Sequence, residues 1–238
     1  MDRVPTGIKG LDEILDGGFM RNSSILLCGA PGSGKTNLGL NFLYKGAAEY
    51  GEKGLYLTLE LPIEEIVKNA VIVYPKWDWD STLNKDIFIK KVSREDIGTL
   101  PTVIRDSVHD LGVKRIVIDS ITMLSLFTKD EADFRDSLFK LLDFIRSLEC
   151  TALIAAEKPY SDRDRVEFSI EEFVCDGVII LYSIPKGELR YKAMEVLKMR
   201  SINHQTKLCP FEIGPDGITV YPVESLFWLD SERKKKSK

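Results

Sequence analysis

The sequence predicts an α/β fold built on a mostly parallel, twisted sheet that is flanked by helices and closed by antiparallel β-hairpins. Up to residue 183, apolar runs of strand length alternate with segments of helical period, which is typical of a parallel sheet with helical crossovers. Beyond that point, the turn signals "IPKGELR" and "GPDG" separate short alternating strands and predict the hairpins. We expect one domain at 1–230 and a basic tail at 231–238.

The individual elements follow from hydrophobic pattern and turn chemistry. Apolar runs predict strands at 23–29, 54–60, 86–93, 114–120, 150–157 and 176–183. Segments of helical character lie at 35–50, 62–74 and 131–149. Pro62 suits the first turn of the second helix, because the N–H that it lacks has no helical partner there. In the third helix, apolar residues recur at spacings of three and four and predict one buried stripe.

Composition narrows the class of protein. A hydrophobic content of 44% with 29% charged residues is ordinary for a soluble globular chain, and the net charge of −4 gives no overall attraction to nucleic acid or to anionic membranes. The chain contains neither an apolar run of the roughly 18 residues that span a bilayer nor an N-terminal signal-peptide core. The four cysteines form no C-x-x-C pair and indicate a reducing compartment. We therefore expect a cytoplasmic protein without membrane contact.

Residues 29–36, "GAPGSGKT", fit the phosphate-binding pattern G-x-x-x-x-G-K-[ST] between an apolar strand and a helix. The glycines let successive N–H groups turn toward phosphate oxygens, and the helix adds its positive N-terminal dipole. Lys35 is expected to bridge the β- and γ-phosphates, and the Thr36 hydroxyl to ligate Mg²⁺. A chance glycine-rich turn is the alternative, but both flanks of the motif are those of a P-loop. The expected nucleotide-binding residues are Gly29, Ala30, Pro31, Gly32, Ser33, Gly34, Lys35, Thr36 and Asn37.

Two carboxylates end predicted strands at the edge of the sheet where ligands bind in open α/β folds. Asp119 closes the strand "RIVID" and would be the second magnesium ligand, facing Thr36; capping a turn is its alternative. Glu60 closes "LYLTLE" and could orient an attacking water, although position alone does not separate that role from an exposed strand-end carboxylate. The N/T-K-x-D pattern that reads guanine is absent, which favours ATP as the nucleotide.

Four segments in order resemble the KaiC-like branch of the RecA superfamily of ATPases. They are "PTGIKGLDEILDGGFMRNSSILLCGAPGSGKT", "GLYLTLELPIEEIVKNA", "EEFVCDGVIILY" and "EVLKMR" with a histidine close behind, and the likeness covers roughly residues 4 to 224. The resemblance implies a RecA-like P-loop NTPase core that assembles into a hexameric ring of identical chains, with ATP between neighbouring subunits. It also implies that Glu60 is the catalytic glutamate.

The resemblance implies further site residues near the C-terminus. Lys198 and Arg200 match cations that reach the γ-phosphate from the adjacent subunit, and His204 matches a histidine near the same interface. On an extended strand, residues two apart share a face and lie ~7 Å from each other, so both cations could point at one triphosphate. A solvated cationic strand face is the alternative.

The chain also departs from the family pattern. Leu61 stands where many relatives have a second glutamate beside the residue matching Glu60, and "RSINH" replaces the usual R-G-T-x-H. Clock-type KaiC has two tandem cores, with neighbouring phosphorylated Ser and Thr in the second. Here the corresponding loop offers only the separated Ser161 and Ser169, so the resemblance does not support a timekeeping autokinase.

The leading hypothesis is an oligomeric, Mg²⁺-dependent ATPase that couples hydrolysis to a conformational or signalling change, with an unidentified protein client. The rival is a RecA-like DNA-binding module of recombination or repair, but its expected DNA-contacting loop at 158–175 carries three cations against five carboxylates, so nucleic acid is not favoured. A small-molecule kinase is a third alternative, but no arginine-rich lid segment stands out in the sequence to support it. A nucleotide-binding switch with negligible turnover is the fourth alternative, and Leu61 gives it some support.

Overall fold

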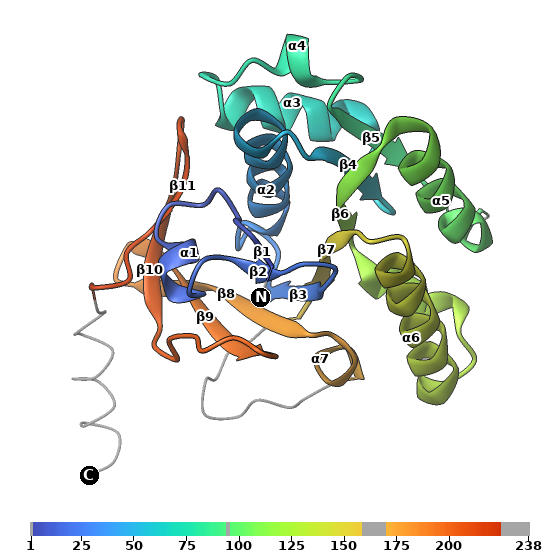
Figure 1. Ribbon diagram of the computed structural model, residues 1–238. Helices are drawn as coiled ribbons and strands as arrows, with labels where there is room; N and C mark the ends of the chain where they lie inside the picture. Colours follow the sequence, from blue (N-terminus) through green and yellow to red (C-terminus); the bar gives the residue numbers. More distant parts are fainter. Residues whose placement is uncertain (1, 94–95, 159–169, 225–238) are drawn as a thin grey trace.

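The computed structural model describes residues 2–93, 96–158 and 170–224. Within these residues, a nine-stranded sheet in the order β11-β10-β9-β8-β3-β7-β6-β4-β5 runs through the molecule (Figure 1). A short antiparallel pair, β1 (Arg3–Val4) with β2 (Phe19–Met20), stands apart from it. The strands of the large sheet are β3 (Ser24–Gly29), β4 (Lys53–Thr58), β5 (Ile87–Lys91), β6 (Val113–Asp119), β7 (Thr151–Glu157), β8 (Gly177–Lys186), β9 (Leu189–Met199), β10 (Cys209–Gly214) and β11 (Gly217–Val220).

The strand directions confirm the predicted fold class. From β8 through β3, β7, β6 and β4 to β5 all neighbours are parallel, and from β8 to β11 they are antiparallel. All six predicted strands form, and the last of them continues to Lys186 before the hairpin turn. The turn signals therefore mark the point where the sheet changes from parallel crossovers to hairpins.

The helices pack on both faces of the sheet (Figure 1). They are α1 (Leu11–Ile14), α2 (Lys35–Tyr50), α3 (Ile63–Val73), α4 (Trp79–Thr82), α5 (Leu100–Leu111), α6 (Glu131–Ser147) and α7 (Ile170–Val174), with 3₁₀ turns at Ile97–Thr99 and Ile121–Phe127. The three predicted helices form, whereas α5 was not predicted. Its buried stripe is narrow, with Leu100 and Ile104 as its buried apolar residues, but a helix there is what a parallel β5–β6 crossover requires.

Two apolar cores, one on each face, hold the layers together. Successive residues of β3 point to opposite faces, so Ile25 and Leu27 pack with α2 and α3, while Leu26 packs on the side of α5 and α6. The central strands are buried on both faces, which is why they read as continuous apolar runs rather than alternating ones. No helix in the described ranges is long and apolar enough to cross a membrane.

The register places the ends of the parallel strands at one edge. Gly29 pairs with Glu157 across β3 and β7, and Thr58 pairs with Asp119 across β4 and β6. β3 lies between β7 and β8. From β3 the chain crosses over β7 and β6 to β4, and it later crosses back from β7 over β3 to β8, so the order of the strands reverses at β3. Ligands of open α/β sheets bind at such a switch point, beyond the carboxyl ends of the strands.

Candidate nucleotide-binding site

The P-loop connects the end of β3 to the start of α2. Gly32 and Gly34 have φ angles of 74° and 114°, in the left-handed region that favours glycine. Gly34 is also the residue that precedes the first turn of α2, so the amides of this turn face the loop. The Lys35 Nζ donates to the carbonyl oxygens of Gly29 at 2.8 Å and Ala30 at 3.3 Å. The lysine thus curls over the loop, within reach of a phosphate held by the amides.

A cleft of about 450 Å³ opens above this loop. It brings together most of the predicted site, from the P-loop, the first turn of α2 and the ends of β4 and β6. Ala30 and Ser33 belong to the loop itself, and the Ser33 side chain is buried beneath it. The cleft is lined by Pro31, Gly32, Gly34, Lys35, Thr36, Asn37, Thr58, Glu60, Leu61, Glu65, Ile66, Asn69, Asp119 and Glu157.

Thr36 and Asp119 meet as the sequence predicted. The Thr36 hydroxyl donates to Asp119 Oδ2 at 2.8 Å, and the Tyr56 hydroxyl donates to the same oxygen. Burial, and then the neighbouring Asp119 carboxylate, raise the pKa of Tyr56 well above its usual value, so the phenol remains a donor. A hydroxyl and a carboxylate oxygen beside a phosphate loop are the ligands that Mg²⁺ accepts in nucleotide sites. The residues present therefore fit Mg²⁺, although their role as its ligands stays a prediction.

Glu60 lies at the mouth of the cleft, just beyond β4. Its Oε1 accepts a hydrogen bond of 2.6 Å from the Ser120 hydroxyl, and Ser120 directly follows Asp119. The buried serine therefore fixes the carboxylate on the side of the cleft where the predicted metal ligands lie. Leu61 also lines the cleft, with 42% of its surface exposed.

Several lining residues were not predicted. Asn69 of α3 donates to the Asn37 Oδ1 at 2.8 Å, and the Tyr74 hydroxyl holds the Asn37 carbonyl at 2.9 Å. Glu157 could have been found from the sequence, because it ends a predicted strand at the same edge as Asp119. Asn69 gives no comparable signal, since its contact depends on how α3 packs against α2.

Lys198 and Arg200 lie at the opposite end of the sheet from the P-loop. Lys198 pairs with Val178, near the start of β8, while the P-loop follows the far end of β3. The Lys198 Nζ donates to the Cys175 carbonyl at 2.7 Å and to the Glu172 carbonyl at 2.9 Å, at the C-terminal end of α7. Burial, and then the nearby Arg200, lower the pKa of Lys198.

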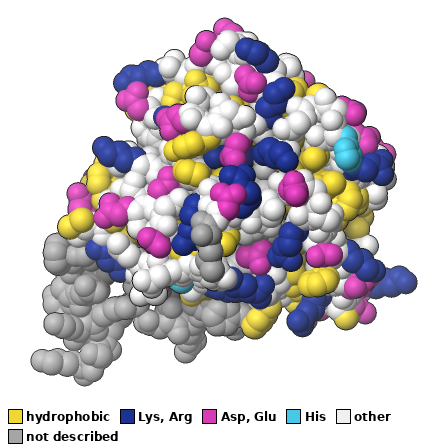
Figure 2. All heavy atoms as spheres, in the orientation of Figure 1, with side chains coloured by type: hydrophobic (Ala, Val, Ile, Leu, Met, Phe, Trp, Pro, Cys, Tyr) yellow, Lys and Arg dark blue, Asp and Glu magenta, His cyan; other side chains and the backbone are white. Residues whose placement is uncertain are grey.

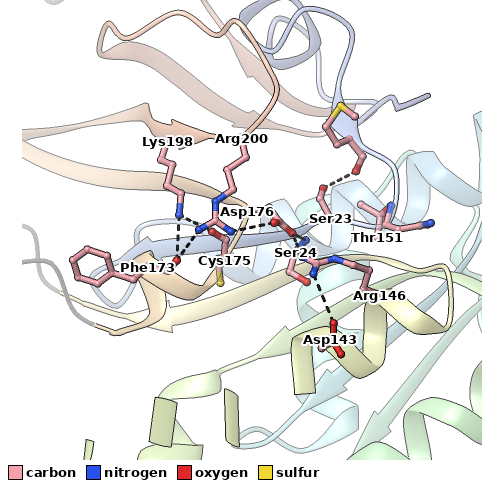
Figure 3. A network of polar contacts seen from close by, with 12 residues as sticks. Ser23, Ser24, Asp143, Arg146, Thr151, Phe173, Cys175, Asp176, Lys198 and Arg200 are labelled. Atoms are coloured by element: carbon pink, nitrogen blue, oxygen red, sulfur yellow. Dashed lines mark hydrogen bonds and ion pairs between the residues drawn. The ribbon is translucent and has the colours of Figure 1, made fainter. Parts of the chain in front are cut away.

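Arg200 points toward the same place (Figure 3). Its guanidinium donates to the Phe173 carbonyl at 3.0 Å and contacts the Asp176 carboxylate at 3.4 Å. Arg146 of α6 binds the other Asp176 oxygen at 2.8 Å. The two predicted cations therefore share one side of β9, as their spacing indicated, and contact none of the residues that line this chain's own cleft.

His204 follows β9 and lies apart from the cleft as well. Its Nδ1 is 3.4 Å from the Ile202 carbonyl oxygen, and the ring is partly buried. Ser161, Ser169 and the predicted tail 231–238 lie outside the described residues.

One lysine that the sequence reading missed does reach the P-loop. Lys192 of β9 donates from Nζ to the Gly32 carbonyl at 2.7 Å and lies 3.4 Å from the Ser33 carbonyl. Its neighbour in β8 is Ser183, two residues beyond the partner of Gly29. Only the hairpin register brings it there, so no local sequence pattern could have indicated the contact.

The sheet order, the P-loop at its switch point and the Thr36–Asp119 pair define a P-loop NTPase with a RecA-like core. The family model described as "ATPase: KaiC" matches residues 4–225. The chain therefore belongs to the KaiC family of ATPases.

Relatives of known name agree with this assignment. The circadian clock oscillator protein KaiC of Parasynechococcus marenigrum (strain WH8102) is 30% identical over 95% of this chain, and the circadian clock protein KaiC2 of Synechocystis sp. (strain ATCC 27184 / PCC 6803 / Kazusa) is 30% identical over 94%. The chain spans 46% and 41% of these two relatives, less than half of each. A crystal structure of the KaiC-like protein PH0186 from Pyrococcus horikoshii OT3 superposes with a TM-score of 0.81 at 35% identity, covering 93% of this chain and 99% of that one.

Proposed function

We propose that this chain binds ATP with Mg²⁺ in the cleft and hydrolyses its terminal phosphate. The observation that carries the proposal is that the P-loop, the Thr36–Asp119 pair and Glu60 all line one cleft. Lys35 would bind the β- and γ-phosphates, and Thr36 with Asp119 would hold Mg²⁺. When bound, the metal would neutralise charge on the phosphate oxygens. Glu60, fixed by Ser120, would orient the attacking water and accept its proton.

We further propose that the site is completed by a neighbouring subunit of a homo-oligomer, as a hexameric ring with ATP between subunits. The lining of the cleft includes four carboxylates, Glu60, Glu65, Asp119 and Glu157, and one cation, Lys35. A triphosphate adds more negative charge than Lys35 and Mg²⁺ together neutralise, so a further cation would stabilise the outer γ-phosphate oxygens. Lys198 and Arg200 lie too far away to serve this chain's own site, which supports a role at the site of a neighbour, with His204 beside them.

We also propose a general physiological role. Hydrolysis would drive a conformational or signalling change that a protein client recognises. The protein would act in the cytoplasm, as one domain at 1–230 with a basic tail at 231–238. The relatives named as circadian clock proteins support regulation of this kind, although the chain spans less than half of their length.

A nucleotide switch with negligible turnover is the second candidate. Leu61 favours it, because an exposed apolar side chain lines the cleft directly beside the single glutamate expected to activate water. DNA binding gains less support: on the face seen in Figure 2, basic and acidic side chains are interspersed rather than gathered into a basic area.

Phosphate release by Glu60→Gln separates the two candidates. The ATPase proposal expects release at least about a hundredfold slower than wild type, because a positioned general base contributes 10²–10⁴-fold. Binding of ATP should persist in the variant. Glu64→Gln is the matched control, since Glu64 is an exposed glutamate of α3 that does not line the cleft. Equal background release of phosphate by wild type and Glu60→Gln would refute the ATPase proposal and support the nucleotide switch.

A further inference from the structure

We propose that Lys192 is a positioning residue: it holds the P-loop from β9 and links occupancy of the nucleotide site to the strand that carries Lys198. The binding half of this inference needs only a nucleotide in the cleft. The linkage half rests on the proposed function, because Lys198 and Arg200 matter only if they serve a neighbour's site.

The contact is made to the carbonyl side of the loop. In a phosphate-binding loop the N–H groups turn toward the anion, so the carbonyls of the same peptides turn away from it. Lys192 donates to the carbonyls of Gly32 and Ser33. The peptide of the Gly32 carbonyl has its N–H on Ser33, which donates to the Ala30 carbonyl at 3.1 Å, so here the ammonium supports the turn of the loop itself. The peptide of the Ser33 carbonyl has its N–H on Gly34, and the ammonium polarises this peptide in the direction that strengthens that N–H as a donor.

Within the part of the chain that the structure describes, the charge of Lys192 is not balanced by a carboxylate. Among the described residues no Asp or Glu oxygen lies within 4.0 Å of its Nζ, although many surface lysines of this chain are paired. Burial lowers the pKa of Lys192, because desolvation disfavours the charged form of the ammonium. A partly desolvated cation held only by carbonyls is stabilised when an anion enters nearby. Bound phosphate is such an anion, so the arrangement favours the loaded state of the loop.

β9 joins this contact to the opposite edge of the sheet. Lys192 and Lys198 are six residues apart on the same strand, which corresponds to ~20 Å. The strand is paired with β8 from Leu189 to Met199, with a register shift of one residue at Leu197, and with β10 at Ala193 and Met194. A displacement of the P-loop at one end is therefore passed to the cations at the other end rather than absorbed by a loop between them.

Calorimetric titration of the full chain with Mg²⁺·ADP tests the binding half. We expect Lys192→Met to bind ADP about tenfold more weakly, the loss of one charge-assisted hydrogen bond, and Lys192→Arg to stay within about threefold of wild type. Arg190→Met is the matched control, because this exposed β9 cation donates to the Ser183 carbonyl of its own hairpin and, among the described residues, to no part of the P-loop. Thermal unfolding of each variant separates lost binding from lost folding. Binding by folded Lys192→Met within twofold of wild type would overturn the proposal.

Amide hydrogen exchange over 189–200 tests the linkage. Saturating ADP should slow exchange along β9 in the wild type, and in Lys192→Met this protection should be lost although the site is filled. Equal protection in both proteins would overturn the linkage. Because ADP is the probe, a wild type that releases no phosphate would refute the proposed hydrolysis without affecting either measurement.

Discussion

Mixing two inactive variants tests whether the active site is shared between subunits. Lys35→Ala removes the P-loop cation, and Arg200→Ala removes the proposed cation from the neighbour. The register separates these functions within one chain: Gly177 pairs with Ile25 and Leu181 with Gly29, so the two ends of the β3–β8 pairing lie about 13 Å apart. Arg200 follows β9 at the end remote from the P-loop. Neither variant should therefore repair its own site.

The size of the recovery follows from how the sites are composed. In a ring with heterologous contacts, each interface joins the P-loop of one chain to the cations of the next. After equal mixing, half of the P-loops and half of the Arg200 side chains are intact, and about a quarter of the interfaces pair the two. The mixture should therefore release phosphate at about a quarter of the wild-type rate per chain, although each variant alone is nearly inactive.

The assay is steady-state phosphate release after the two chains have been co-expressed or dissociated and reassembled together. Arg146→Ala is the control, because Arg146 binds the same Asp176 carboxylate as Arg200 and its loss disturbs that ion pair equally. This control should stay active. A mixed sample no more active than the separate variants, with exchange of chains verified by native mass measurement, would refute a shared site. A monomer at all concentrations would refute it as well.

Three further predictions address the metal, the buried ion pair and alkaline stability. Asp119→Asn should raise the Mg²⁺ concentration for half-maximal ATP binding at least about tenfold, measured by magnesium titration, because an amide replaces the carboxylate beside Thr36. Glu52→Leu leaves the fully buried Arg115 guanidinium without its 2.8 Å partner and should lower the free energy of unfolding, measured in urea, by about 3 kcal/mol. Adding Arg115→Met to this variant should restore most of that loss. Burial raises the pKa of Cys150 to about 11, above the value near 9 of an exposed thiol. As the pH rises, the unfolded chain therefore loses this proton before the folded chain does, and the free energy of unfolding should fall between about pH 9 and 11. The fall should be shallower in Cys150→Ala, and identical curves would exclude the thiol as its cause.

The parts of the site that the sequence predicted are those carried by local chemistry. The P-loop is contiguous, and its glycines, lysine and threonine each have a backbone or side-chain reason to stand where they do. Glu60 and Asp119 end predicted strands, so a parallel sheet brings them to one edge without knowledge of the packing. Glu157 also ends a predicted parallel strand, so its place at this edge follows from the same reasoning.

The parts that escaped prediction depend on register and packing. Tyr56 reads as one apolar residue in a buried strand, yet its hydroxyl reaches Asp119 because β4 and β6 pair in the observed register. Lys192 reaches the P-loop only because the β8–β9 hairpin pairs it with Ser183, two residues beyond the partner of Gly29. Side-chain type alone does not reveal which face of a strand meets a ligand.

The structure adds most to the sequence-based prediction in the segment after β8. A sequence reading that treats the hairpins as a closing feature assigns importance only to Lys198, Arg200 and His204, which the resemblance singles out. In the structure β9 has a cation at each end: Lys192 on this chain's own P-loop, and Lys198 on the carbonyls that end α7. A strand anchored at both ends cannot shift at one without straining the other. If the far end serves the neighbouring subunit, the hairpin connects adjacent nucleotide sites, and cooperativity between them should fall in Lys192→Met.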